Sequence, residues 1–373
     1  MNGEPNPRST DLLYHYTDQN GLVGIVERQE LWATNLGCLN DLSEFAHGLD
    51  YLRSVRNGII EELLGDRPCD ALETKSFKAV FEYLMDEAER RYCLRDPAEY
   101  LYVFSLFDSS RCVKSSMTEV DAGDNLQQWR AYSKGGFGYC IGFDRNLLEG
   151  KVKELDNALQ HTFCGQCMYG DAEKRESANR ISSALIPACD LAVAISYPQT
   201  DAGRHALENT IGRLGQELEQ SRAIRETAPS QGGKDYAPLN RSEARELISG
   251  AMSTYFGRLL IDSALMKHAA FSSEREWRVV RLAFALSQEI KFRTSNNGII
   301  PYATIPIRGS ENPSRMMPGL IKRIVVGPLG NASGVAKARA ISLVKMLLEN
   351  NGMEVAGCSG EAGVVVESSR LPC

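Results

Sequence analysis

Long apolar runs are absent from this chain. A membrane-spanning helix needs about 20 consecutive apolar residues, and the 373-residue sequence contains no such run. Its polar beginning, MNGEPNPRSTD, has neither the basic nor the apolar part of a secretory signal. We therefore expect a cytoplasmic protein without a membrane partner, in which residues 1–11 form a flexible leader.

Basic charge and metal-binding motifs are scarce as well. The formal net charge is −6, which disfavours a protein that coats nucleic acid through bulk electrostatic attraction. The ten cysteines are scattered and show none of the dense spacing of a secreted disulfide scaffold. His161, Cys164 and Cys167 stand three residues apart, but no second CxxC or CxxH pair is present to complete a zinc site. We predict reduced thiols and no bound metal.

Apolar residues, in contrast, make up 43% of the chain, enough for a sizeable core. Runs of β-branched and aromatic residues occur between stretches of helical periodicity, which predicts an α+β protein. Residues 12–170 are expected to form the first half of the core, with two amphipathic helices, and residues 268–373 the second half. Residues 171–267 have few aromatics and many Glu, Arg, Ala and Ser, which predicts a helical insertion.

The stretch from residue 12 to residue 34 packs a strand, a helix and a second strand into little sequence. The alternation over residues 13–17 predicts a strand with Tyr14 and Tyr16 on one face. His15 and Thr17 then share the other face. Asp18 is expected to cap a helix whose apolar positions recur at spacings of three and four. His15 has two interpretations: a residue lining a binding cleft, or an ordinary histidine whose ring nitrogen bonds a neighbouring backbone carbonyl.

A second stretch, FSSEREWRVVRL at residues 271–282, is rich in charge and predicts a loop that leads into a strand. Glu274 and Glu276 are separated by one residue, and on a strand that spacing points both carboxylates to the same face. One interpretation is a solvated edge with surface ion pairs, each worth little to stability. The other is glycosyl chemistry, in which a fixed carboxylate stabilises an oxocarbenium-like ribosyl cation.

Several of these motifs resemble known families. The order tyrosine, histidine, aromatic, threonine at residues 14–17, followed by Asn20–Leu22, Ile25 and Ala33-Thr34, is similar to the opening of ADP-ribosyltransferases of the His-Tyr-Glu type. With three further motifs, the same stretch resembles the bacterial family called domain of unknown function 2971. Those motifs are Asn40-Asp41 with Glu44, Trp129–Phe143 and Glu274–Arg278, and the resemblance extends to about Pro372.

The resemblance implies a fold and a function. The expected fold is a split mixed β-sheet core like that of ADP-ribosyltransferases, with flanking helices and the helical insertion. The expected function is that of a mono-ADP-ribosyltransferase or NAD glycohydrolase, of the kind found in toxins and phage-defence effectors. Such an enzyme consumes NAD as its substrate, and its macromolecular acceptor is a protein or a nucleic acid.

The resemblance also implies catalytic roles. Glu276 is expected to be the catalytic carboxylate and Glu274 the residue that orients the acceptor. Replacing Glu276 by glutamine is therefore expected to slow the chemistry while leaving folding nearly intact. His15 is expected to hold the adenosine-side ribose of NAD through a ring nitrogen, assisted by Thr17.

The remaining expected NAD-binding residues are Tyr16, Ser105 and one aromatic side chain that stacks on the nicotinamide ring. Trp129 and Tyr132 follow each other on one face of a short predicted helix, and either is a candidate for that stacking. Tyr102, on the strand YLYVFSLF, is a third candidate. The sequence does not decide among the three.

Two other classes of function compete with the enzyme. A sensor module would bind a nucleotide or a protein partner in the same cleft without turnover. A nuclease-like effector is disfavoured because no Asp, Glu and His cluster with metal-site spacing is visible in the sequence. An enzyme requires His15 and Glu276 to lie in one site, whereas a binding module does not.

Overall fold

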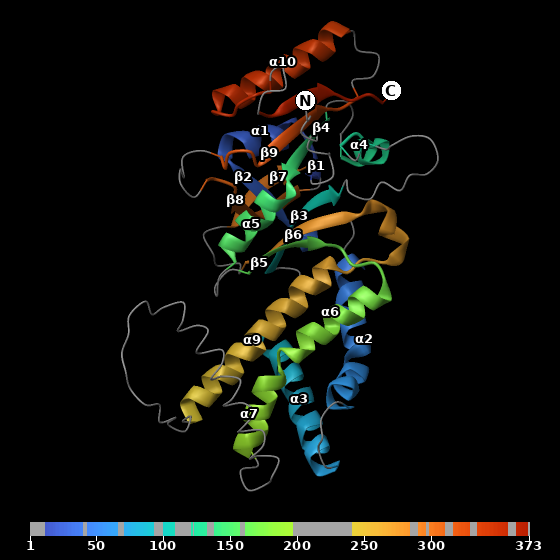
Figure 1. Cartoon of the computed structure of the whole chain (residues 1–373), viewed down its shortest axis with the longest axis vertical. Coiled ribbons are helices and arrows are strands. Elements are labelled where there is room, and N and C mark those ends of the chain that lie inside the picture. Colours follow the sequence, from blue (N-terminus) through green and yellow to red (C-terminus); the bar gives the residue numbers. More distant parts are fainter. Residues whose placement is uncertain are drawn as a thin grey trace, which may run out of the picture. The chain divides into compact units, whose positions relative to one another are not determined.

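The computed structural model divides into two compact units (Figure 1). The sheet unit comprises Met1–Leu42, Ala98–Cys167 and Lys267–Cys373, and the helical unit comprises Ser43–Pro97 and Met168–Met266. The structure describes residues 12–39, 43–65, 71–92, 100–108, 121, 123–132, 138–156, 161–196, 241–283, 290–295, 298–309, 316–328, 334–356 and 363–371. The predicted leader at residues 1–11 lies outside these ranges.

One ten-stranded sheet forms the framework of the sheet unit. Its strands are β1 Leu12–Asp18, β2 Glu30–Asn35, β3 Leu101–Asp108, β4 Gly138–Asp144, β5 Thr162–Gln166, β6 Glu276–Leu282, β7 Ile290–Ser295, β8 Gly298–Pro306, β9 Ile321–Val326 and β10 Val365–Ser368. They follow the order β10-β9-β4-β1-β3-β2-β8-β7, and β6 pairs with β3 and β5. Because β10 is parallel to β9 while β1 is antiparallel to β4, the sheet is mixed, and the expected α+β class is confirmed.

The sheet divides at β3. One edge of β3 pairs with β6 along residues 101–107. Its other edge pairs with β1 only at Phe107 and Asp108, and with β2 only at Tyr102 and Val103. Residues 104–106 lie between these two short pairings, so β1 and β2 diverge from a common neighbour. β3 is therefore the strand from which β1 and β2 diverge in this mixed sheet.

The two faces of the sheet differ in what covers them. The first face carries the larger apolar core, in which β1 contributes Leu13 and β3 contributes Phe104 and Leu106. Helices α1 Gln19–Arg28, α5 Arg145–Leu155 and α10 Gly334–Asn350 add buried side chains to this core. The second face carries a smaller aromatic core, which includes Trp129 of helix α4 Leu126–Tyr132. Its other buried members are Tyr14, Tyr16, Phe107, Cys140 and Val325.

The helical unit contains five described helices: α2 Ser43–Gly65, α3 Ala71–Tyr92, α6 Asp171–Ser183, α7 Ile186–Ser196 and α9 Arg241–Leu265. α2 and α9 approach closely because Gly48 has no side chain: a Cβ atom there would lie 2.2 Å from the carbonyl oxygen of Ser263. The buried carboxylate of Asp262 accepts hydrogen bonds from Ser177 and from Arg180, the latter at 3.3 Å. Polar contacts thus supplement apolar packing in this unit.

The structure groups the helices differently from the sequence prediction. The two amphipathic helices within residues 12–170 were expected to belong to the sheet core, but α2 and α3 belong to the helical unit together with α6, α7 and α9. An apolar stripe shows that a helix packs against something, and it does not specify whether the partner is a sheet or another helix. The partner comes from residues more than a hundred positions later, which periodicity does not identify.

Candidate functional site

Glu276 is the first residue of β6, and its carboxylate lies at the centre of a buried ion cluster. Its Oε2 atom accepts a hydrogen bond from Lys267 Nζ at 2.7 Å, and its Oε1 atom accepts one from Arg278 Nε at 2.8 Å. The Glu276 residue is 4% exposed, and Lys267 and Arg278 are 3% exposed. The interpretation of this charged stretch as a solvated edge is therefore wrong for Glu276.

The ion cluster fixes the charge of Glu276. Burial has the largest effect on the pKa of Glu276 and raises it, but the charges of Arg278 and Lys267 together outweigh burial and lower the pKa from 4.5 to about 2. The carboxylate is consequently ionised at neutral pH and held in one orientation by three hydrogen bonds. A fixed, ionised carboxylate is the group that stabilises a developing positive charge.

Glu274 reaches the same cluster from outside the strand. It ends the short 3₁₀ helix η4, Ala269–Glu274, and Arg275 between the two glutamates has a left-handed backbone with φ of 47°. The two glutamates therefore do not share a strand, and the alternation of side chains along a strand does not apply to them. Their carboxylates still meet, because Lys267 Nζ also donates to Glu274 Oε2 at 2.6 Å. Unlike Glu276, the Glu274 side chain is 37% exposed.

Tyr132, at the end of α4, lies beside this cluster. Its phenol is close enough to Glu276 and Glu274 for their charges to raise its pKa, after burial as the main cause, to about 12. Its ring lies 6.1 Å from that of Phe107, which is opposite Glu276 in the pairing of β3 and β6. Tyr132 nevertheless remains 40% exposed.

The other two stacking candidates are buried. Trp129 is 2% exposed, its ring meets that of Tyr16 edge to face at 4.7 Å, and its Nε1 atom donates to Asp124 at 2.8 Å. Tyr102 is also 2% exposed and belongs to the core on the first face. Tyr16 accepts a hydrogen bond from the Asn125 backbone at 2.9 Å. Of the three candidates, Tyr132 alone presents a large exposed surface.

His15 has the ordinary surroundings of a structural histidine. Its Nδ1 atom lies 2.9 Å from the backbone oxygen of Ser105, and its ring stacks on Phe104 at 4.1 Å between centroids. Burial lowers the pKa of His15 to about 4, although the contact with Ser105 opposes this shift, so the ring is neutral at pH 7 and Nδ1 is the donor. Thr17 points toward α1, where a Cβ atom added to Gly21 would collide with its hydroxyl.

The sheet separates His15 from Glu276. Side chains alternate along a strand, so Phe104, on which His15 stacks, and Phe107, opposite Glu276, point to different faces of β3. The backbones of β1 and β6 are only two strand spacings apart, roughly 10 Å. The structure therefore does not bring these two side chains into one site. Ser105 lies opposite Arg278 and shares the second face with Glu276.

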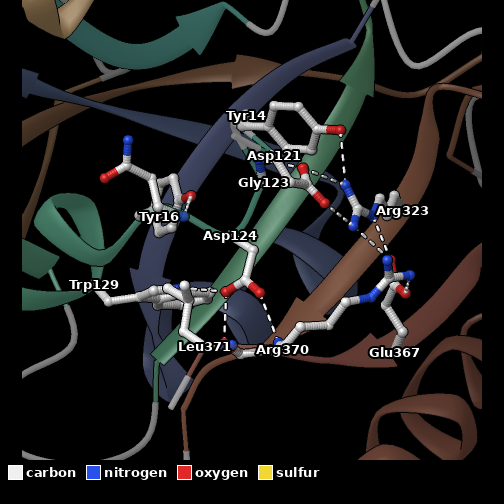
Figure 2. A network of polar contacts seen from close by, with 12 residues as sticks. Tyr14, Tyr16, Asp121, Gly123, Asp124, Trp129, Arg323, Glu367, Arg370 and Leu371 are labelled. Atoms are coloured by element: carbon white, nitrogen blue, oxygen red, sulfur yellow. Dashed lines mark hydrogen bonds and ion pairs between the residues drawn. The ribbon is translucent and has the colours of Figure 1, made fainter. Parts of the chain in front are cut away.

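A second polar network lies on the same face, between β1, β9 and the C-terminal residues (Figure 2). Arg323 binds Asp121 through both terminal nitrogens, at 2.8 and 2.5 Å, and donates to Tyr14 at 3.1 Å and to Glu367 at 2.6 Å. Burial lowers the pKa of the Arg323 guanidinium and raises that of the Asp121 carboxyl, but these contacts together outweigh burial, so the pKa of Arg323 is raised and that of Asp121 is lowered. Arg323 thus ties β1 and β10 to a loop that precedes α4.

The sequence contains a signal for this network. A glycine inside a strand is costly unless another group has to approach the backbone closely, and Gly142 is such a glycine in β4. At Gly142 the approaching groups belong to the protein: a Cβ atom there would lie 3.0 Å from the Tyr14 ring and 3.3 Å from Arg323. Lys267, the central cation of the other cluster, was missed because no spacing rule relates it to Glu276.

Comparisons with known proteins support one family assignment. Residues 128–279 match the family model described as protein of unknown function DUF2971. This segment belongs to the DUF2971 family. The DUF2971 segment includes α4 from residue 128 onward, Glu274 and Glu276, and it does not reach the stretch with His15. No curated protein and no solved structure matches the chain significantly.

The part of the chain that the structure describes contains neither a metal site nor a membrane-spanning helix. No group of three His, Cys, Asp or Glu side chains there is placed to hold a metal ion. Within the same residues, no helix combines the length and the apolar character needed to cross a bilayer. The candidate site on the second face therefore consists of the Glu276 ion cluster and Tyr132.

Proposed function

We propose that the protein cleaves the bond between nicotinamide and ribose in NAD at the ion cluster of Glu276, as an ADP-ribosyltransferase or an NAD glycohydrolase. One observation carries this proposal: an ionised carboxylate is immobilised within electrostatic reach of a tyrosine that is 40% exposed. Nicotinamide cleavage needs both a fixed negative charge near the ribose and a surface that positions the leaving ring.

In this mechanism Glu276 acts on the ribose and does not exchange a proton. Its carboxylate accepts a hydrogen bond from the ribose 2′-hydroxyl, and the bond strengthens as positive charge develops on the sugar. The electron pair of the C1′–N bond leaves with nicotinamide, which departs neutral. Water or an acceptor nucleophile then adds to C1′ and loses its proton to solvent. A pKa of about 2 suits this role, because a general acid would need a raised pKa.

Tyr132 and Glu274 surround that reaction in the proposal. Tyr132 supplies the stacking surface for nicotinamide, since Trp129 and Tyr102 are buried. Glu274, which is partly exposed at the edge of the cluster, is positioned to guide an acceptor. His15 takes no part in this site, because its side chain points to the other face of the sheet. The proposed reaction therefore departs from the His-Tyr-Glu type, which requires His15 and Glu276 in one site, and it depends on Glu276 and Tyr132 without the expected contact of His15 with the adenosine-side ribose.

A second candidate function, a sensor that binds NAD without cleaving it, is favoured by a different observation. Lys267 and Arg278 already occupy both oxygens of Glu276. A carboxylate that is fully engaged by buried cations is also typical of a structural ion cluster. The two candidates share the site around Tyr132 and differ in whether nicotinamide is released.

The test is to incubate the purified full chain with NAD and to measure nicotinamide by chromatography and NAD binding by calorimetry. Release of nicotinamide supports the enzyme. Binding without release supports the sensor. Neither binding nor release, in the absence and presence of candidate acceptors, would rule out both functions.

A further inference from the structure

The C-terminal residues are bonded to the segment that carries α4. Asp124, which is 8% exposed, accepts a hydrogen bond from the Ser369 hydroxyl at 2.5 Å and one from the Arg370 backbone nitrogen at 2.7 Å. The side chain of Leu371 packs on the aromatic core of the second face. Figure 2 shows the Asp124 carboxylate between Trp129 on one side and the C-terminal chain on the other.

The same carboxylate also holds α4. Trp129 Nε1 donates to Asp124 Oδ1 at 2.8 Å, so one side chain joins the middle of the helix to the end of the chain. The start of the helix is fixed separately, because the Asn125 backbone nitrogen donates to the Tyr16 hydroxyl. Tyr132 follows Trp129 by three positions, which is less than one helical turn. Its place beside Glu276 therefore depends on where α4 is held.

A second contact anchors the approach of the chain end to Asp124. Arg323 binds Asp121 in the loop before α4 and Glu367 in β10, two residues before Ser369. The parallel pairing of β10 with β9 fixes the same stretch of backbone. Ser369 and Arg370 thus reach Asp124 directly from the end of β10, which is fixed in the sheet. The loop before α4 and the residues after β10 are joined at two points, through Arg323 and through Asp124.

We propose that residues Ser369–Leu371 act as a strap that positions α4. Asp124 is the positioning residue, because it bonds the strap and Trp129 of α4 and so determines where Tyr132 lies. The importance of Tyr132 in this statement rests on the proposed function. The strap itself does not, since it concerns contacts within the folded chain. It also gives a role to Ser369–Leu371, to which neither candidate function assigns one.

The experiment compares two substitutions at one position. Arg370→Pro removes the backbone N–H that Asp124 accepts, whereas Arg370→Ala removes only the side chain, which is 81% exposed in its contact with Glu367. Amide hydrogen exchange is measured in the full chain. We expect α4 to exchange about tenfold faster in Arg370→Pro than in Arg370→Ala, with β3 and β6 unchanged. Equal exchange of α4 in the two variants would overturn the proposal.

The second readout is kinetic. Because stacking on Tyr132 acts equally on bound NAD and on its transition state, Arg370→Pro should raise the KM for NAD about tenfold at unchanged kcat. If the wild-type protein releases nicotinamide and Arg370→Pro loosens α4 without changing the KM for NAD, the proposal that the strap positions Tyr132 for NAD binding is wrong.

The two proposals fail separately. If the wild-type protein releases no nicotinamide, the proposed enzyme fails, and the exchange of α4 still decides whether the strap exists. If Arg370→Pro does not fold, Ser369→Ala, which removes one donor to Asp124, replaces it. Unchanged α4 exchange in that variant would overturn the strap.

Discussion

The two polar networks on the second face of the sheet are built in opposite ways. The Glu276 cluster draws its members from residues 267–278, and both of its cations are almost completely buried. The Arg323 network joins residues up to 309 positions apart, such as Tyr14 and Arg323, and its charged groups are partly exposed. The first network concentrates charge in one place. The second connects strands, loop and chain end.

This difference separates chemistry from positioning. A buried carboxylate that accepts three hydrogen bonds has a fixed charge and orientation, which is useful for stabilising a cation but costly to disturb. The Arg323 network, in contrast, is spread over several elements and fixes where elements such as α4 lie. Substitutions in the two networks should therefore differ in size and in kind.

The largest effect is expected for Glu276→Gln. If the proposed chemistry is right, nicotinamide release falls on the order of a hundredfold to a thousandfold, because a transition-state contact is lost. The sequence-based expectation that folding stays intact does not fit the structure. Neutralising Glu276 removes the carboxylate that the two buried cations share, although Lys267 keeps its bond to Glu274, and we expect this loss to cost roughly 3–5 kcal/mol of unfolding free energy.

The matched control for that variant is Glu274→Gln. Its side chain is partly exposed and bonds only one of the two cations, so unfolding in urea should shift little. If Glu274 guides an acceptor, transfer falls while hydrolysis by water survives. An equal loss of stability in both variants would show that the two glutamates have the same structural role.

A smaller effect is expected for Arg323→Met. Asp121 and Glu367 would then face each other without the cation that joins them, and the Tyr14 hydroxyl would lose its donor. We expect a loss of roughly 2–4 kcal/mol in urea unfolding. Arg323→Lys should recover only part of it, since an ammonium group does not bind a carboxylate through two nitrogens. Full recovery by lysine would contradict the importance of the paired contact.

The pH dependence of stability tests the structural assignment of His15. Its pKa falls from 6.5 to about 4 on folding, mainly through burial, so the folded state favours the neutral ring. The stabilisation that the neutral His15 ring gives to the folded state is therefore complete above pH 6.5 and is lost as the pH falls toward 4. In His15→Gln, the free energy of unfolding should decline less between pH 6.5 and 4 than in the wild-type protein. Identical pH profiles for both proteins in urea unfolding would refute the assignment.

The smallest expected effect concerns Tyr132. Tyr132→Ala should weaken NAD binding about tenfold by removing the stacking surface, and Tyr132→Phe should leave it nearly unchanged. The side chain is partly exposed, so neither variant should alter stability much. Calorimetric titration with NAD measures the difference. Equal affinity in the alanine and phenylalanine variants would exclude stacking on this ring.

Local features of the fold could be predicted from the sequence. Alternation placed Tyr14 and Tyr16 on one face of β1 and His15 on the other, and Asp18 caps α1 as expected, accepting from Gly21. The meeting of the Glu274 and Glu276 carboxylates was also foreseeable, because the two residues are neighbours in sequence. These features depend on interactions within a few residues.

Features that depend on distant partners could not be predicted. Asp124 and Arg370 are 246 positions apart, and no pattern in either segment indicates that the two residues are in contact. The opposite orientation of His15 and Glu276 follows from the register of β1, β3 and β6, which is set by the whole sheet. The left-handed backbone at Arg275 gave no signal, because arginine rarely adopts that conformation.

The most direct test of the account is nicotinamide release by the charge-balanced variant Lys267→Met/Glu276→Gln. This variant removes one positive and one negative charge, so the net charge of the cluster is unchanged and the variant should regain much of the stability that Glu276→Gln loses. We predict that it unfolds close to the wild-type urea concentration and still releases nicotinamide at least about a hundredfold more slowly. A stable double variant with wild-type release would show that Glu276 belongs to a structural ion cluster and has no part in catalysis.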